Sequence, residues 1–237
     1  MLYKTLNFTK HSKRPHFYSN FVSTVDGKVV VTSNPTGYWP LGSKLDRDTL
    51  TELRTHADAL IHGATTAESH QTLASLNKAD FGKARQKLKR DATLPYFVLS
   101  GRPSADLQSV FTERADTPVF LITTQSAAVP PELDAVARVI RFGQDKVDLI
   151  KFAEFLHKQG YKNVLVEGGP HVLGSFLADD LLDEIFVTIA PKIFGNDNHQ
   201  TLTMVEGHLF QPDEIKNLTL ISTIQKKDEL FLRYRIK

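Results

Sequence analysis

The stretch "KNVLVEGGPHVLGSFL", residues 162–177, decides the fold of this chain. The apolar run 164–166 is typical of a buried strand, and it leads directly into a carboxylate, Glu167, and two glycines. A helix is predicted to begin at or just after Pro170, because proline suits the first turn of a helix. We therefore expect a buried strand that passes through a tight glycine turn into a helix.

This turn has two interpretations. The free N–H groups of a first helical turn, with the helix dipole behind them, attract an anion such as a phosphate. The glycines are equally consistent with a tight turn chosen for steric reasons, with Glu167 as a favourable charge near the helix start. The spacing is GGPxxxG, ending at Gly174, and not the dinucleotide fingerprint GxGxxG. The stretch alone leaves both interpretations open.

Outward from this stretch, short β-rich runs alternate with amphipathic ones, which predicts a largely parallel sheet covered by helices on both faces. Asp46, Asp145 and Asp148 are plausible helix start signals. Predicted strands cover residues 16–23, 58–63, 95–100, 117–123, 137–142, 162–168 and 183–191, and predicted helices include 47–55 and 147–158. Residues 70–94 and 192–214 are expected to be polar connections.

The C-terminal part departs from this pattern. The run "LTLISTIQKKDELFLRYRI" predicts two strands that turn at residues 226–228, which suits an antiparallel edge on an otherwise parallel sheet. The predicted fold is therefore α/β, with three layers in the order helix, sheet, helix and an antiparallel C-terminal hairpin. We expect a single domain over residues 1–237, because a chain of this length can form one α/β domain.

Composition excludes several classes of protein. Apolar residues make up 41% of the 237 residues, charged residues 24%, and the formal net charge is only +2. The basic run 83–90 is expected to be a solvated helix face, so we expect no nucleic-acid partner. With no cysteine, no signal peptide and no membrane-length apolar run, a cytoplasmic protein without a membrane partner is expected.

Four other loops carry candidate chemistry. Asp26 and Lys28, in "STVDGKVV", follow a predicted strand and could bind sugar hydroxyls and a phosphate, although Asp-Gly is also ordinary turn chemistry. Thr66, in "LIHGATTAES", could cap a helix or donate to a phosphate. Arg102, in "VLSGR", suits a phosphomonoester such as the 2′-phosphate of NADP. Trp39, in a loop rich in Gly and Pro, could cover a bound ring.

Other catalytic signatures are missing from the sequence. The nine histidines form no HExxH and have no cysteine partners, so no metal site is predicted. His62, His70 and His171 are noted because they lie beside the candidate loops. Neither a GxSxG elbow nor a phosphate-binding GxxxxGK[ST] loop is present, which argues against a serine hydrolase or a nucleoside-triphosphate enzyme.

Taken in order, the motifs resemble those of one family. They are "SxxDGK", a following "W", "LRxxADALIxGxxT", a strand ending in "SGR", and "VLVEGGPxxxGSFL…LLDEIxxxIAPKIxG". This series is similar to the reductase domain of riboflavin biosynthesis, the RibD C-terminal type, whose fold is dihydrofolate reductase-like. The resemblance covers about residue 14 to the C-terminus, and its most specific segment is 164–195. It includes no zinc deaminase domain, which implies a stand-alone reductase.

The resemblance implies a reaction and a set of residues. NADPH would deliver a hydride to the open-chain ribosyl group of a pyrimidine ribosylamine 5′-phosphate, and a ribityl side chain would form. Glu167 and Asp26 would be the catalytic candidates and the candidate proton donors, and Glu167 would also contact the substrate with Arg54. The implied cofactor-binding residues are Val22, Trp39, Gly63, Thr66, Ser100, Gly101, Arg102, Gly168, Gly169, Pro170, His171, Val172, Leu173, Gly174 and Ser175.

One segment departs from the family pattern. Where relatives carry "ADDPxLxxR", this chain has "ESHQTLASLN", with His70 near the place of the acid and no final arginine. The substrate phosphate would then be held by groups such as Arg54 and Lys28. Three readings stay open: reduction of the deaminated or the diamino pyrimidine, a dihydrofolate or pterin reductase-like activity, and a catalytically silent NADPH-binding protein. The family resemblance also implies a homodimer.

Overall fold

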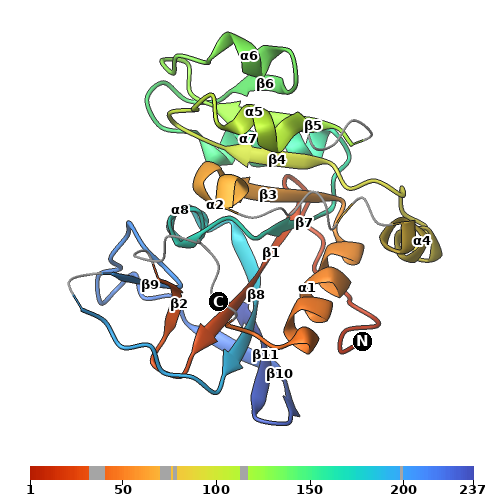
Figure 1. Cartoon of the computed structure of the whole chain (residues 1–237), viewed down its shortest axis with the longest axis vertical. Coiled ribbons are helices and arrows are strands. Elements are labelled where there is room, and N and C mark those ends of the chain that lie inside the picture. Colours follow the sequence, from red (N-terminus) through yellow and green to blue (C-terminus); the bar gives the residue numbers. More distant parts are fainter. Residues whose placement is uncertain (32–40, 70–75, 77–78, 113–116, 198–199) are drawn as a thin grey trace. The chain divides into compact units, whose positions relative to one another are not determined.

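A computed structural model describes residues 1–31, 41–69, 76, 79–112, 117–197 and 200–237. The chain forms two compact units, shown in Figure 1. Unit 1 comprises Met1–Asn7, Phe17–Leu53 and Gly169–Lys237, and unit 2 comprises Phe8–His16 and Arg54–Gly168. Each unit contains its own strands and helices and is described separately.

Unit 1 contains four strands in the order β10-β11-β8-β1. Strand β1 (His16–Thr24) runs parallel to β8 (Leu182–Ala190), whereas β8 pairs antiparallel with β11 (Glu229–Ile236). Strand β11 forms an antiparallel hairpin with β10 (Leu218–Lys226), and Lys227 in its turn has a φ of 54°. The predicted C-terminal hairpin is therefore confirmed.

Two helices and a small second sheet complete unit 1. Helix α1 (Lys44–His56), whose residues from Arg54 onward belong to unit 2, begins beside Ser43, whose hydroxyl accepts hydrogen bonds from the N–H groups of the first turn. Helix α8 (Pro170–Ala178) follows the glycine turn, as the sequence predicted. The second sheet consists of β2 (Lys28–Val31) and β9 (Thr201–Thr203), which pair antiparallel.

Unit 2 contains five parallel strands in the order β7-β3-β4-β5-β6. They are β3 (Ala59–Gly63), β4 (Tyr96–Leu99), β5 (Val119–Thr123), β6 (Arg138–Arg141) and β7 (Asn163–Val166). The helices that the structure describes in this unit are α2 (Ala64–Ser69), α4 (Ala79–Lys87), α5 (Leu107–Thr112), α6 (Pro131–Asp134) and α7 (Leu149–Lys158). In Figure 1, α5 lies in front of these strands and α7 behind them.

The core of unit 2 explains why these runs form strands. Phe97 in the middle of β4 stacks on Phe120 of β5, with ring centroids 4.5 Å apart, and packs against Phe152 of α7 at 5.7 Å. The strand positions of β3 and β4 are buried throughout. Strands buried on both faces read as continuous apolar runs, which is the pattern that the sequence showed.

Most predicted elements are confirmed, and the bounds of the seven predicted strands differ by at most two residues from those observed. Asp148 caps α7 by accepting the N–H of Lys151. Helix α4 and strand β9, however, lie in segments expected to be polar connections, because neither carries a strong periodic pattern. The α/β class with a mostly parallel sheet is confirmed.

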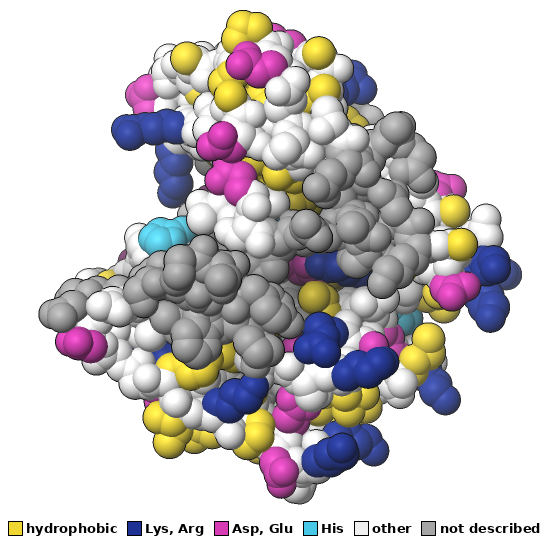
Figure 2. Space-filling view, in the orientation of Figure 1, with side chains coloured by type: hydrophobic (Ala, Val, Ile, Leu, Met, Phe, Trp, Pro, Cys, Tyr) yellow, Lys and Arg dark blue, Asp and Glu magenta, His cyan; other side chains and the backbone are white. Residues whose placement is uncertain are grey.

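Basic and acidic side chains are mixed on the surface, in keeping with a net charge of only +2. On the face shown in Figure 2, the Lys and Arg side chains of the described residues are interspersed with Asp and Glu. Among the residues that the structure describes, no helix is both long enough and apolar enough to cross a bilayer.

Candidate active site

The carboxyl ends of the parallel strands of unit 2 meet at one edge of the sheet. Strand β3 ends at Gly63 and continues into α2, β4 leads into Ser100, and β7 leads directly into Glu167. The register holds them together, because the Glu167 N–H donates to the Ile61 carbonyl at 3.0 Å. In open α/β sheets this edge is where ligands bind.

Glu167 is held by a bidentate ion pair with Arg54. The Arg54 Nε donates to Oε1 at 2.6 Å and Nη2 donates to Oε2 at 2.5 Å. Both side chains are only 7% exposed. The guanidinium comes from the last turn of α1, 113 residues away in the sequence. The structure therefore joins the two residues that the family resemblance assigned to the substrate.

The ion pair determines the charge of Glu167. Burial raises the pKa of this carboxyl, but the charge and hydrogen bonds of Arg54 outweigh burial, and the contact with His62 adds to them. The pKa is lowered from 4.5 to about 2. At neutral pH Glu167 is therefore a carboxylate that accepts hydrogen bonds and carries no proton to give.

His62 and Tyr96 extend this pair into a buried chain. The His62 Nε2 lies 3.0 Å from Glu167 Oε2, and the Tyr96 hydroxyl oxygen lies 2.9 Å from His62 Nδ1. Both side chains are buried, on the neighbouring strands β3 and β4. Sequence reasoning noted His62 only for its place beside a loop and missed Tyr96, which reads as an ordinary apolar strand residue.

Arg85 holds the end of α1 that carries Arg54. Its Nη1 donates to the carbonyl oxygens of Arg54 at 3.2 Å and Ala57 at 2.7 Å, and its Nε donates to the carbonyl of Asp91 at 2.7 Å. The Arg85 side chain is buried. The expectation that the basic run 83–90 forms a solvated helix face is therefore wrong at this position, because the carbonyls at the helix end satisfy the guanidinium.

The loop after β4 offers a different environment. Ser100 is at the border of burial, and its N–H donates to the Ile122 carbonyl at 3.0 Å, whereas Gly101 and Arg102 are exposed. Thr66 lies in the first turn of α2. The guanidinium of Arg102 is thus presented to solvent at the carboxyl edge of the sheet, where an anionic ligand could reach it.

In unit 1, Asp26 organises a loop. Its carboxylate accepts the N–H groups of Phe194 at 3.2 Å and Gly195 at 2.8 Å. The hydroxyl of Thr24 and these N–H groups hold the pKa of this exposed carboxyl below its usual value. The N–H of Lys28 donates to the same Thr24 hydroxyl at 2.8 Å. This hydrogen bond holds the Asp-Gly segment in a turn.

Of the predicted phosphate turn, Gly168 belongs to unit 2, whereas Gly169 and helix α8 belong to unit 1. Gly169 caps α8 with a φ of 48°, a conformation that favours glycine, and Pro170 takes the first helical position. Gly174 has a separate reason to be glycine, since a Cβ there would lie 2.5 Å from the carbonyl oxygen of Glu206. The Ser175 hydroxyl donates to the carbonyl of His171 at 3.0 Å.

The remaining predicted cofactor residues are placed as follows. Val22 is half-buried on β1 and pairs with Thr188 of β8, and Val172 and Leu173 lie in α8. Trp39 and His70 lie outside the described residues.

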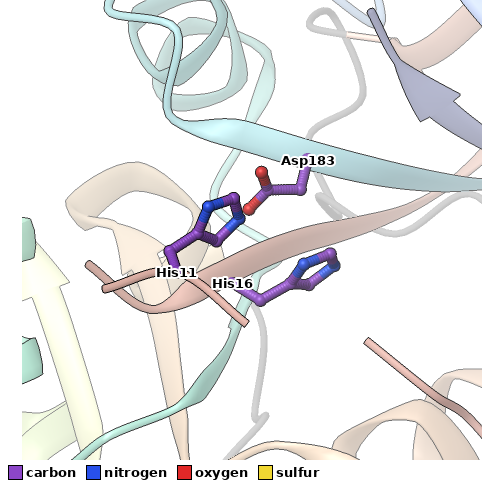
Figure 3. Close-up of side chains that lie close together, drawn as sticks. All are labelled: His11, His16 and Asp183. Atoms are coloured by element: carbon purple, nitrogen blue, oxygen red, sulfur yellow. The ribbon is translucent and has the colours of Figure 1, made fainter. Parts of the chain in front are cut away.

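Figure 3 shows three further side chains. His11 precedes β1, and His16 is the first residue of that strand. Their rings stack with centroids 6.0 Å apart. Asp183, drawn on β8, accepts the N–H of Phe17 at 2.8 Å within unit 1. This last contact ties the start of β1 to β8, which is a structural role in the sheet.

With this geometry in place, comparison with known proteins gives a consistent result. Residues 15–229 match the sequence profile of the RibD C-terminal domain. The 2,5-diamino-6-ribosylamino-4(3H)-pyrimidinone 5′-phosphate reductase of Methanothermobacter thermautotrophicus is 28% identical over 233 residues, which is 94% of this chain and 99% of that protein. The reductase of the same name from Archaeoglobus fulgidus is 26% identical over 83% of this chain and 89% of its own length.

A solved structure shares the fold. The crystal structure of a pyrimidine reductase-like protein from Corynebacterium diphtheriae has a TM-score of 0.70 and 22% sequence identity. The alignment covers 94% of this chain and 92% of that one.

Proposed function

Since the chain belongs to the RibD C-terminal domain family, we propose that it is an NADPH-dependent reductase of riboflavin biosynthesis. Its substrate is a pyrimidine ribosylamine 5′-phosphate, whose ribosyl group is reduced to ribityl. The observation that carries this proposal is the match to the two 2,5-diamino-6-ribosylamino-4(3H)-pyrimidinone 5′-phosphate reductases. The alignments cover 89% and 99% of those proteins. Their names favour the 2,5-diamino pyrimidinone as the substrate.

The charges of the site support a division of roles. Hydride transfer needs the nicotinamide and the acceptor carbon to be held close together, and this supplies much of the rate. Glu167 is ionised at neutral pH, so its role is to bind and orient the substrate as a hydrogen-bond acceptor. The proton that the reduced atom takes up then comes from water. Asp26, also ionised, orders its own loop in unit 1 through the N–H of Gly195.

The cofactor is proposed to use the loops named from the sequence. Residues 168–175 bind the pyrophosphate, because the turn ends in a helix whose first N–H groups attract anions. Arg102, exposed beside Ser100 and Gly101, binds the 2′-phosphate that distinguishes NADPH from NADH. Gly63 and Thr66, at the end of β3 and the start of α2, are proposed to contact the cofactor as well.

The substrate phosphate is proposed to bind Lys28. Arg54 was the other candidate, but it already donates two hydrogen bonds to Glu167. Lys28 is partly exposed and follows the turn that Asp26 orders.

We further propose a single functional domain that forms a homodimer. The hairpin strand β10 is a candidate edge for pairing, because Leu218 and Leu220 are exposed there. Light scattering of the purified chain tests the dimer.

The decisive experiment measures NADPH oxidation with three substrates. The purified chain is incubated with the diamino pyrimidine ribosylamine phosphate, its deaminated form and dihydrofolate, and the reduced product is identified by mass spectrometry. Turnover of a pyrimidine to its ribityl form supports the proposal. Turnover of dihydrofolate alone identifies a pterin reductase, and NADPH binding without oxidation identifies a catalytically silent binder.

A further inference from the structure

We propose that His62, held in place by Tyr96, is a positioning residue that orients the Glu167 carboxylate toward a hydrogen-bond donor of the substrate. The inference rests on the proposed reductase function and adds a residue and a recognition rule to it. The relevant contacts all lie within unit 2, and they join Tyr96, His62, Glu167 and Arg54 in one buried chain.

The hydrogen-bonding capacity of Glu167 limits what it can bind. An ionised carboxylate offers about two acceptor positions on each oxygen. Among the described residues, Oε2 receives two contacts, from Arg54 Nη2 and His62 Nε2, whereas Oε1 receives one, from Arg54 Nε. The position left on Oε1 accepts a proton-bearing group, so the substrate presents a hydroxyl or an amine N–H there and not a carbonyl.

The contacts of His62 with Glu167 and Tyr96 indicate a proton on Nε2 of its ring. A neutral imidazole with its proton on Nε2 donates to Glu167 and accepts the Tyr96 hydroxyl proton at Nδ1. The other neutral form would place an unprotonated nitrogen 3.0 Å from the carboxylate, so that two acceptors would face each other. A protonated ring would also donate from Nε2 to Glu167, and its Nδ1–H would then donate to the Tyr96 hydroxyl oxygen.

This arrangement gives the chain a direction. The Tyr96 hydroxyl donates to His62, and His62 donates to Glu167, so each group fixes the rotation of the next. Tyr96 is fully buried on β4. The geometry therefore points to orientation of the carboxylate.

Variants of His62 separate positioning from packing. His62→Leu removes the donor and keeps a buried side chain, whereas His62→Gln places an amide N–H where Nε2 lies. With the pyrimidine substrate, we expect kcat of His62→Leu to fall by about tenfold to about a hundredfold, because a displaced orienting group costs rate. His62→Gln is expected to recover a substantial part of the lost kcat, and Tyr96→Phe is expected to lose less kcat than His62→Leu. The KM for NADPH is expected to stay within about twofold of wild type in all three variants.

A matched control is Leu121→Ala, which leaves a cavity in buried strand β5 of the same sheet. It is expected to lower the unfolding temperature without the fall in kcat. A kcat loss in Leu121→Ala equal to that in His62→Leu, or no recovery in His62→Gln, would overturn the positioning role.

A spectroscopic measurement tests the inference without turnover. In the full-length protein labelled with ¹⁵N-histidine, His62 is expected to carry a proton on Nε2, and the signal is assigned by its loss in His62→Gln. A proton on Nδ1 alone would refute the proposed orientation. If wild type reduces neither pyrimidine, the proposed function fails, and the ring state alone then decides whether His62 orients Glu167.

Discussion

The carboxylate of Glu167 is buried and yet ionised, because three donor contacts replace the water it has lost. A buried pair of this kind adds little net stability when it is complete, since desolvation offsets the attraction. Removing one partner is costly, because the other charge stays buried without compensation. The stability of the pair therefore depends on the protonation state of Glu167.

The pH dependence of stability follows from this. The folded pKa of Glu167 lies below its unfolded value, so its contribution is complete above pH 4.5 and is lost as pH falls toward about 2. A shift of this size corresponds to about 3 kcal/mol. Glu167→Gln is expected to lower the free energy of unfolding at neutral pH, and the difference from wild type is expected to shrink on acidification. Urea unfolding from neutral pH down to about pH 4 measures it.

The matched control for this titration is Glu154→Gln, on the exposed surface of α7. It is expected to leave both the stability and its pH dependence close to wild type. A constant difference between wild type and Glu167→Gln at all pH values would contradict the lowered pKa.

Two glycines in helices give a second residue-level prediction. Gly174→Ala in α8 is expected to destabilise the protein by about 1 to 3 kcal/mol, because the new Cβ meets the Glu206 carbonyl oxygen at 2.5 Å. In Gly82→Ala of α4 the atom nearest to the new Cβ is the Ala92 Cβ at 3.4 Å, an ordinary contact, and alanine favours a helix by about 1 kcal/mol. Urea unfolding should therefore show opposite signs. Equal effects would contradict the close packing at Gly174.

At the scale of elements, the C-terminal end of α1 determines where Arg54 lies. The last carbonyls of a helix have no partner within it, and a buried cation there also complements the helix dipole. Arg85 supplies that cation from α4, through a guanidinium that reaches the carbonyls of Arg54 and Ala57 together. Helix α4 thus contributes to the site without touching Glu167.

Replacing Arg85 tests this dependence. Arg85→Met keeps an unbranched apolar stem but removes the guanidinium that donates to the carbonyls of Arg54 and Ala57, and we expect a loss of about 2 to 3 kcal/mol in unfolding free energy. Turnover is expected to fall as well, because the backbone at Arg54 is released. Lys87→Met, at an exposed position of the same helix, is the control. An equal loss of unfolding free energy in both variants would show that the carbonyl contacts of Arg85 do not stabilise the fold.

The elements were predictable to the extent that local pattern defines them. Apolar runs and the Pro170 start identified the strands and α8, since both signals are contained in a few neighbouring residues. The pairing of Glu167 with Arg54 joins residues 113 positions apart, and no local pattern encodes it. Arg85 sits in a basic run that looks solvated, and only the packing of α4 against the end of α1 reveals its burial. The family resemblance named Glu167 and Arg54 but not the contact between them.

At the scale of the whole molecule, the proposed cofactor residues are distributed along much of the chain, from Val22 to Ser175. A ligand that binds the folded chain and not the unfolded one stabilises the fold as a whole, by about 2.7 kcal/mol at a hundred times its Kd. Thermal unfolding with added nucleotide therefore reports cofactor choice independently of any substrate.

The last prediction concerns the choice between NADPH and NADH. We expect NADPH to raise the unfolding temperature more than NADH, because Arg102 is proposed to pair with the 2′-phosphate that NADH lacks. Arg102→Ala should weaken NADPH binding by about tenfold or more, the loss of one charged hydrogen bond, and leave NADH unchanged. Arg138→Ala is the matched control, since it removes an exposed arginine at the amino end of β6 in the same unit. Equal weakening of both nucleotides by Arg102→Ala, or of NADPH by Arg138→Ala, would assign the effect to general charge and not to the 2′-phosphate.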